Sequence, residues 1–368
     1  MTGIRVAAVA GLGLVGGSLA RDLAALGVRV LGHDRDPRAV RAALAQGVVH
    51  AALGPGLEGV EEADLLVLAV PVSAAGPLLA GALPRLGALR LVTDVGSTKR
   101  SVCAAAADLG IGDRFVGSHP LAGSHESGWE ASRPGLFRGA RVFLTPAEET
   151  RPPALALARE LWTALGARPE AMGAAEHDRL LARTSHLPHA AACATALALA
   201  DAGIPRAELG PGGLGVTRLA ASSPEMWTAV ALDNADALVP ALDSLRARLS
   251  ELHDALLRGD RGAVHAFFTA AREWSREGNS FLERDLRAHH PSPPTREAGM
   301  DRNRQNDEGT DGSQRVTDRE RPAEDGMQGV AGERERMGGY GYDTPADMEQ
   351  ASDTGARETE GADEPSGS

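Results

Sequence analysis

Cysteine is nearly absent from this sequence, because Cys103 and Cys193 are the only two among 368 residues. Each lies in an alanine-rich stretch that predicts helix, so no disulfide framework is indicated and a reducing, cytoplasmic location is expected. Long apolar runs are missing as well, since glycine, proline or charge interrupts every candidate for the ~18–20 apolar residues of a membrane span. The first residues show no export-signal pattern. We therefore expect a soluble protein that does not enter a membrane.

The chain also lacks an excess of positive charge. Its formal net charge is −12, and the segment from Pro291 onward, with 19 acidic and 9 basic residues, holds −10 of it. A nearly neutral body followed by an acidic tail has no basic surface for nucleic acid or for anionic lipid. The expected partner is therefore a small-molecule substrate, and neither nucleic acid nor a membrane.

Short apolar runs alternate with helical segments over the first half of the chain. The runs lie at 4–10, 28–32, 65–70, 89–93, 115–118 and 142–144. Glycine, proline or a capping residue bounds each helical segment between them. This alternation predicts an α/β, Rossmann-like fold with a doubly wound parallel sheet. We assign residues 1–172 to this domain.

Strand signals stop near residue 171, and three long segments rich in alanine and leucine follow at 174–202, 224–258 and 260–288. They predict an all-helical domain over residues 173–289. A bundle or an interlocked pair of subunits would bury so much apolar helix surface, so we expect a homodimer and a role for this domain in dimerisation. Residues 290–368 have almost no apolar periodicity and predict a disordered acidic tail.

Gly11, Gly13 and Gly16 form a G-x-G-x-x-G run that follows the first apolar run and opens a helix. The first glycine permits a tight turn, the second a close approach to a pyrophosphate, and the third close packing of helix on strand. Leu14 and Val15 belong to the helix N-terminus, which faces the phosphate charge. The sequence therefore predicts a dinucleotide site.

Asp34 ends the second apolar run, where an acid typically accepts hydrogen bonds from the adenine ribose. Such an acid repels a 2′-phosphate and favours NAD over NADP as the cofactor. Arg35 leaves the opposite choice open, because an arginine can also support a phosphate. Val70 and Pro71, at the end of the third run, and Asp94, at the end of the fourth, complete the predicted cofactor contacts.

The run Asp94-Val95-Gly96-Ser97-Thr98-Lys99 lies at the carboxyl edge of the predicted sheet, where doubly wound sheets bind ligands. Helix capping alone would explain Ser97 or Thr98. Lys99 is the single lysine in a chain otherwise rich in arginine. A spatially restricted contact would explain why a flexible ammonium stands there, although chance is the alternative and its role stays open.

His119 ends the next apolar run, within Gly117-Ser118-His119-Pro120. A structural histidine at a turn is the plain interpretation. Its position beyond strand ends that should line a nicotinamide favours acid–base chemistry instead, because an imidazole with a pKa near 6.5 is suited to taking a hydroxyl proton.

His186 and His189 lie three residues apart, on neighbouring positions of a predicted helix face. Zinc would need a third ligand at a recognisable spacing, so we predict no metal. Substrate contact or helix-end hydrogen bonding is the interpretation instead. Arg218 follows a glycine-rich loop in an otherwise apolar segment, and its guanidinium can hold a carboxylate with two hydrogen bonds or pair with an internal acid.

Five motifs, taken in order, resemble the prephenate and arogenate dehydrogenases of tyrosine biosynthesis across residues 4–285. They are the glycine run with Asp34, D-V-G-S-T-K, G-S-H-P-L-A-G-S, S-H-L-P-H and T-R-x-A-x-S-S-P-x-M-W. The resemblance implies a dimeric NAD-dependent oxidoreductase with a Rossmann domain and a helical domain. Such enzymes oxidatively decarboxylate prephenate to 4-hydroxyphenylpyruvate, or arogenate to tyrosine.

The resemblance also implies roles for individual side chains. His119 looks like the catalytic histidine that hydrogen-bonds the ring hydroxyl, and Ser97 looks like its supporting hydroxyl. His189 and Arg218 look like substrate-binding residues, and we place His186 with them.

The chain departs from the family pattern shortly before Thr217, where many relatives have a basic residue and then an acid. Here Leu214 and Gly215 occupy these positions, so the choice between prephenate and arogenate stays open, as does inhibition by tyrosine. Two other functions compete: a β-hydroxyacid dehydrogenase, whose usual helical lysine this chain lacks, and a non-enzymatic NAD-sensing scaffold, which would bind the cofactor without turnover.

Overall fold

The computed structural model describes residues 3–123 and 126–289, with 277–289 described by their backbone alone. The predicted acidic tail at 290–368 lies outside the described residues. No helix in the described ranges is both long enough and apolar enough to cross a membrane.

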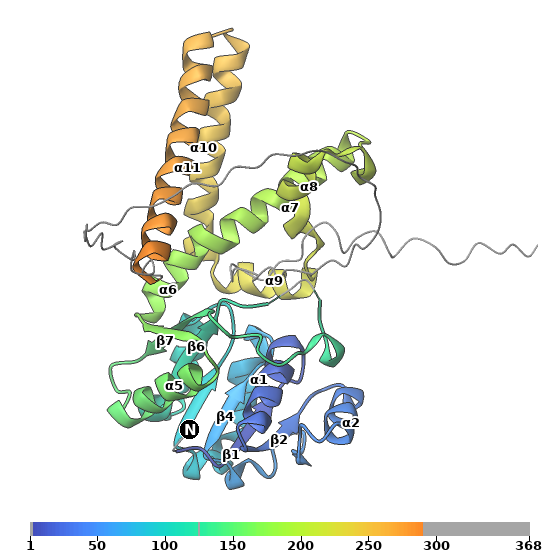
Figure 1. Cartoon of the computed structure of the whole chain (residues 1–368), viewed down its shortest axis with the longest axis vertical. Helices are drawn as coiled ribbons and strands as arrows, with labels where there is room; N and C mark the ends of the chain where they lie inside the picture. The colour runs from blue at the N-terminus through green and yellow to red at the C-terminus, as the bar shows by residue number, and fades with distance from the viewer. Residues whose placement is uncertain (1–2, 124–125, 290–368) are drawn as a thin grey trace, which may run out of the picture. The chain divides into compact units, whose positions relative to one another are not determined.

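A five-stranded parallel sheet, in the order β3-β2-β1-β4-β5, forms the centre of the first half of the chain (Figure 1). A second sheet, in the order β6-β7-β8, continues from it. The strands are β1 (Val6–Ala10), β2 (Arg29–His33), β3 (Ala51–Ala52), β4 (Leu65–Leu68), β5 (Leu91–Asp94), β6 (Val116–Pro120), β7 (Arg141–Pro146) and β8 (Arg168–Ala171). Each predicted apolar run overlaps one of these strands.

The predicted parallel sheet is confirmed for β1 to β5, but the apolar run at 142–144, expected in the same sheet, lies in the second sheet and forms an antiparallel strand there. β6 continues the parallel sheet through a bridge from Val92 to Phe115, but β7 pairs with β6 in the antiparallel direction. In the described part of the β6–β7 connection, a short 3₁₀ turn (Trp129–Ala131) stands where a crossover helix would be needed, so the chain simply reverses. β8 is parallel to β7 because a helix connects these two strands.

Helices cover both faces of the parallel sheet, which confirms the doubly wound fold. Alternate side chains of β1 enter separate apolar clusters, Ala7 and Val9 in one and Ala8 and Ala10 in the other. Helices α1, α2 and α5 contribute to the first cluster, and α3 and α4 to the second. These helices are α1 (Leu14–Ala25), α2 (Pro37–Ala45), α3 (Val72–Ala82), α4 (Arg100–Asp108) and α5 (Pro152–Ala164).

The described chain after β8 is all-helical, as predicted. Its elements are α6 (Ala174–Leu181), a π-helical turn (Ala182–His186), α7 (Leu187–Asp201), α8 (Pro211–Thr217), a 3₁₀ turn (Arg218–Ala221), α9 (Pro224–Asp233), α10 (Ala235–Leu257) and α11 (Arg261–His289). Two details differ from the prediction. The expected glycine-rich loop before Arg218 is helix α8, and the expected helix at 224–258 is divided at Asn234.

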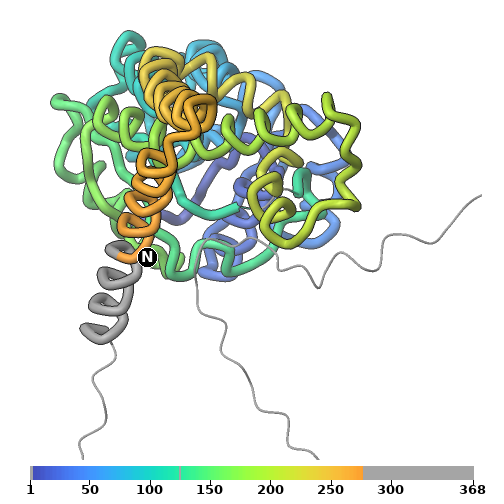
Figure 2. The backbone as a smooth tube through the Cα atoms, turned by 90° about the horizontal axis from the view of Figure 1, so that it is seen from above, coloured from blue at the N-terminus to red at the C-terminus, as the bar shows by residue number. Residues whose placement is uncertain are grey.

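By its packing, the described chain divides inside α10, between Leu245 and Arg246. The first unit holds both sheets and the helices up to the first part of α10. The second unit, described for 246–289, holds the rest of α10 and α11, which follow each other as a helical hairpin through Gly259 (Figure 1, Figure 2). The predicted domain boundary between residues 172 and 173 stays a prediction.

Candidate active site

The glycine run forms a turn that only glycine can make at two of its positions. Gly11 has a φ of +95°, and a Cβ there would lie 2.2 Å from the carbonyl oxygen of Ala69. A Cβ on Gly16 would lie 2.0 Å from the carbonyl oxygen of Gly11. Gly13 is different, because the nearest atom to its added Cβ is the Gly128 nitrogen at 4.0 Å. The surface above Gly13 is therefore open, at the N-terminus of α1, where no side chain caps the first amides.

Asp34 is anchored beside this turn by two backbone amides. Its Oδ2 accepts a hydrogen bond from the Leu12 amide at 2.7 Å, and its Oδ1 accepts one from the Asp36 amide at 2.8 Å. Each carboxylate oxygen retains a lone pair for a further donor. Arg35 next to it is exposed. These residues fit a dinucleotide with free ribose hydroxyls: an open glycine turn for the phosphates and a fixed acceptor for the ribose.

Val70 and Pro71 follow β4 at the same edge. A Cβ on Gly11 would lie 3.2 Å from the Val70 amide, so the structure brings Val70 to the glycine turn. Pro71 is exposed and immediately precedes α3. Ser97 is half-buried in the segment between β5 and α4.

A buried ion pair joins the ends of β5 and β6. The Lys99 ammonium is fully buried, and it donates hydrogen bonds to the Asp94 carboxylate and, at 2.9 Å, to the carbonyl oxygen of Ser118. Asp94 also accepts a hydrogen bond from the Gly96 amide at 2.8 Å. Lys99 thus links the ends of the two strands immediately before His119. The Asp94 carboxylate points toward this ammonium.

His119 is the first member of a buried chain of side chains. Its Nδ1 lies 2.9 Å from Nε2 of His177, and Nδ1 of His177 lies 2.8 Å from Oδ1 of Asp178. An ionised carboxylate can only accept, so His177 donates from Nδ1 and its Nε2 is an acceptor. His119 must then donate from Nδ1, which leaves its Nε2 as a lone-pair acceptor. The chain therefore sets His119 in the tautomer that a general base needs.

The charges along this chain follow from burial and hydrogen bonding. Burial alone would raise the pKa of Asp178, but the hydrogen bonds from His177 and from the Arg100 and Lys99 amides outweigh it and lower the pKa to about 2. Burial, followed by the charges of His177 and Lys99, holds the pKa of His119 well below 6.5. At neutral pH, Asp178 is a carboxylate and His119 is a neutral imidazole.

His186 and His189 lie around Trp227. His189 stacks on the indole with ring centroids 3.5 Å apart, and His186 meets it edge-on at 5.8 Å. Burial lowers the pKa of each histidine to about 4, so both are neutral at pH 7. His186 Nδ1 lies 3.2 Å from the amide nitrogen of Asn234, whereas its Nε2 is buried and has no partner among the described residues. The described part of the chain contains no group of three potential ligands arranged to hold a metal ion.

Arg218 is not in the buried clusters. It begins the 3₁₀ turn that packs against α7, and its side chain is exposed. The structure thus joins His119 to the strand ends, places His186 and His189 on one indole, and leaves Arg218 at the surface of the helical part.

Sequence reasoning missed three members of the site: His177, Asp178 and Asn234. One signal was present, because His177-Asp178 places an imidazole next to an acid at the start of the first helix after the last strand. Asn234 gave no comparable signal.

Comparison with known proteins identifies the family of the chain. A family model described as the nucleotide-binding domain of prephenate dehydrogenase matches residues 19–171. One described as the dimerization domain of prephenate dehydrogenase matches residues 173–270. The chain belongs to the prephenate dehydrogenase family.

Individual relatives cover most of the described chain. A cyclohexadienyl dehydrogenase of Zymomonas mobilis is 35% identical over 275 aligned residues, and the match covers 71% of this chain and 91% of the relative. A prephenate dehydrogenase of Bacillus subtilis is 32% identical over 72% of this chain and 74% of its own length.

Two solved structures share the fold. The prephenate dehydrogenase of A. aeolicus, solved with hydroxyphenyl propionate and NAD+, has a TM-score of 0.69 and 28% identity, and the match covers 74% of this chain and 98% of that one. The arogenate dehydrogenase of Synechocystis has a TM-score of 0.64 and 29% identity, covering 74% and 99%. This dehydrogenase family therefore includes members named for either substrate.

Proposed function

We propose that this chain is an NAD-dependent prephenate dehydrogenase that converts prephenate to 4-hydroxyphenylpyruvate and carbon dioxide. The observation that carries this proposal is the hydrogen-bonded chain from His119 through His177 to Asp178, which leaves His119 Nε2 as a neutral acceptor. His119 lies near the carboxyl end of β6, and Lys99 links this end to the carboxyl end of β5, in the sheet that carries the open glycine turn. Family membership supplies the reaction that such a base would serve.

The cofactor would be held by the glycine turn and by Asp34. The open surface above Gly13 suits the pyrophosphate, and the anchored Asp34 carboxylate suits ribose hydroxyls and disfavours a 2′-phosphate. Val70 lies next to the turn. When bound, NAD+ accepts a hydride from the substrate.

His119 accounts for the proton. As hydride leaves the ring carbon that bears the hydroxyl, Nε2 takes the hydroxyl proton and the C–O bond becomes a carbonyl. The ring carboxylate then leaves as carbon dioxide, and the electron pair of the broken C–C bond enters the ring. The carbonyl oxygen recovers the proton from His119 as the ring becomes aromatic. The reaction thus needs one protein group that accepts a proton and returns it, and this group is His119. Ser97 is proposed to be the supporting hydroxyl of His119.

Substrate binding is assigned to His189, His186 and Arg218. Both histidines are neutral at pH 7, so they can donate hydrogen bonds but cannot balance a carboxylate charge. Arg218 remains as the cation. Holding the carboxylate that departs would stabilise the ground state and slow its loss, so we assign Arg218 to the side-chain carboxylate that the product keeps.

Prephenate is favoured over arogenate by the helix next to Arg218. Arogenate carries an ammonium group beside its side-chain carboxylate, and a carboxylate of the protein would pair with it. α8 has no acidic residue, and Gly215 occupies the position where many relatives have an acid. Arogenate dehydrogenase is the alternative function.

The test is the absorbance of reduced cofactor during turnover with prephenate and, separately, with arogenate. The proposal expects a clearly higher kcat/KM for prephenate with NAD+. A higher kcat/KM for arogenate would show that arogenate is the preferred substrate. NAD+ binding without turnover of either compound would favour a cofactor-sensing protein.

We also propose that the enzyme is a homodimer. Large apolar side chains stay exposed in the helical part of this single chain, including Leu197, Leu232, Leu249, Phe268 and Trp274. Exposed apolar side chains in such number mark an interaction surface. Light scattering on the purified protein should give twice the mass of the chain.

A further inference from the structure

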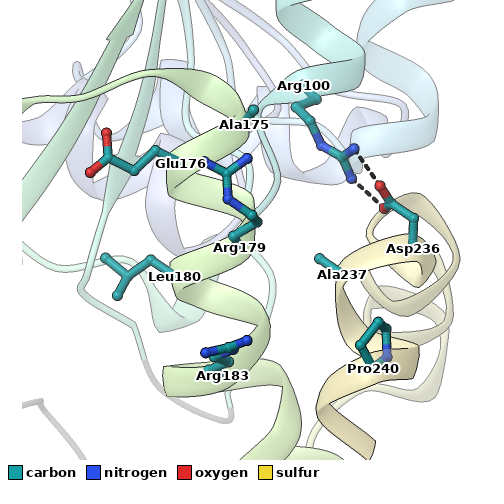
Figure 3. Close-up of a pocket in the computed structure, with 9 residues that line it drawn as sticks. All are labelled: Arg100, Ala175, Glu176, Arg179, Leu180, Arg183, Asp236, Ala237 and Pro240. Atoms are coloured by element: carbon teal, nitrogen blue, oxygen red, sulfur yellow. Dashed lines mark hydrogen bonds and ion pairs between the residues drawn. The ribbon is translucent and has the colours of Figure 1, made fainter.

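Arg100 connects three helices at one point. It is the first residue of α4, and its Nε donates to Oδ2 of Asp178 on α6 at 3.1 Å. Its Nη2 donates to Oδ1 of Asn234 at 3.1 Å, between α9 and α10. The same guanidinium faces both carboxylate oxygens of Asp236 on α10 (Figure 3). All four residues belong to the first unit of the chain.

These contacts orient the Asn234 side chain. A guanidinium has hydrogen-bond donors only, so the atom of Asn234 that faces Arg100 must be the oxygen. The amide nitrogen therefore points the other way, donating to the Asp178 carbonyl oxygen at 2.8 Å and toward Nδ1 of His186 at 3.2 Å. His186 Nδ1 must accept, which places its proton on Nε2.

The same guanidinium orients Asp178. Oδ2 accepts from the Arg100 amide at 3.0 Å and from its Nε, while Oδ1 accepts from the Lys99 amide and from His177, both at 2.8 Å. Arg100 therefore holds one oxygen of the carboxylate, and the other oxygen sets the tautomers of His177 and His119.

We propose that Arg100 is a positioning residue for both histidine clusters: it orients and partly neutralises the Asp178 carboxylate that sets the tautomers of His177 and His119, and through Asn234 it fixes the tautomer of His186. This inference rests on the proposed function. Lysine could not replace it fully, because a single ammonium cannot direct donors at three acceptors in the fixed fork of a guanidinium.

The surroundings of Arg100 allow it to be changed without repacking a core. Its side chain is 37% exposed, and it lines a hollow of about 560 Å³ together with Glu176, Arg179 and Asp236. None of the predicted site residues lines this hollow. Figure 3 shows Arg100 joined directly to Asp236 among the residues that line it.

The variants for the test are Arg100→Gln and Arg100→Lys, with Ser101→Ala as the matched control. Ser101 is the next residue on α4 and donates to Asp233 at 2.8 Å, so its loss also removes a contact from α4 to the helical part, but one that does not reach Asp178. We expect Arg100→Gln to lower kcat about 10²-fold, as for other small misplacements of reacting groups. The KM for NAD+ should change less than twofold, Arg100→Lys should recover part of kcat, and Ser101→Ala should match the wild type.

The pH profile of kcat distinguishes a positioning role of Arg100 from a role that only holds the helices together. The charges acting on His119 are those of His177, Lys99, His186 and Asp178. Without the Arg100 charge, the Asp178 carboxylate is less neutralised and stabilises protonated imidazole, so the acid limb of kcat should move to higher pH in Arg100→Gln and stay in place in Arg100→Lys and Ser101→Ala. Equal losses and unmoved limbs in Arg100→Gln and Ser101→Ala would overturn the proposal.

A second readout does not depend on turnover. In protein labelled with ¹⁵N-histidine, the His186 resonances, assigned with His186→Gln, should report a proton on Nε2 in the wild type and a mixture of tautomers in Arg100→Gln. An unchanged tautomer would refute the role of Arg100 even if the substrate were misassigned. Failure of the wild type to turn over prephenate or arogenate would instead refute the proposed function.

Discussion

Replacing Asp178 with asparagine tests the site most directly, because it changes one oxygen to an amide nitrogen and little else. One side of the new amide must donate. If that side faces Arg100, donor meets donor and the folded state loses stability. If it faces His177, the imidazole must accept at Nδ1 and donate from Nε2. His119 would then carry its proton on Nε2, and the base would be blocked.

The structure supplies the magnitudes. The pKa of Asp178 is about 2 instead of 3.8, which corresponds to about 2.5 kcal/mol of preference for the carboxylate in the folded state. We expect Asp178→Asn to lower the free energy of unfolding by about 2–3 kcal/mol at pH 7. Turnover should fall by about 10²–10⁴-fold, the range expected when a catalytic histidine loses its correct tautomer.

The stabilisation has a defined pH window. Because the folded-state pKa is the lower one, the contribution of Asp178 is complete above about pH 4 and is lost as the pH falls toward 2. Wild type and Asp178→Asn should therefore differ in stability at pH 7 and converge in strongly acidic solution.

Urea unfolding and the absorbance of reduced cofactor measure the two effects. Asp108→Asn is the control, because Asp108 is an exposed acid at the end of α4, and its change should stay within about 0.5 kcal/mol. Turnover of Asp178→Asn within threefold of the wild type would show that the carboxylate does not set the tautomers.

Three further changes probe other parts of the site. His119→Asn should lower kcat about 10²–10⁴-fold with a modest change in KM. In the wild type, kcat should stay level from pH 8 to 6.5 and fall only at a clearly lower pH, because burial lowers the pKa of His119. A fall in kcat that begins above pH 6.5 would contradict this assignment. Gly16→Ala should weaken NAD+ binding in calorimetry, because its Cβ would meet the Gly11 carbonyl oxygen, whereas Gly81→Ala, with open space around it, should bind normally. Lys99→Met should cost about 3–5 kcal/mol in urea unfolding by leaving the buried Asp94 uncompensated, and a loss below about 1 kcal/mol would show that the ion pair is not needed.

The strands, most helices and the glycine turn could be predicted from the sequence because their causes are local. Apolar runs bounded by glycine or proline give the strands. Gly11 is required by its φ of +95°, and Gly16 by its approach to the Gly11 carbonyl oxygen, both within one strand–turn–helix unit, although Ala69 after β4 also crowds both positions. His119 could also be predicted, because it directly follows an apolar run, at the edge where such sheets bind ligands.

Strand direction and helix breaks could not be predicted in the same way. β7 is antiparallel because the described part of the connection before it holds no crossover helix, and the residues of neither strand indicate this direction. The break at Asn234 carries no glycine or proline. It occurs where the Asn234 amide contacts Arg100, Asp178 and His186, all distant in sequence.

The local pattern of residues thus determined the Rossmann-like unit, the helical part that follows it and the histidine at the sheet edge. Tertiary structure decided the chemistry of that histidine. His119 and His177 are 58 residues apart, and Arg100 and Asn234 are 134 apart. A tautomer depends on which atoms face each other across such distances, and only the folded chain brings those atoms together.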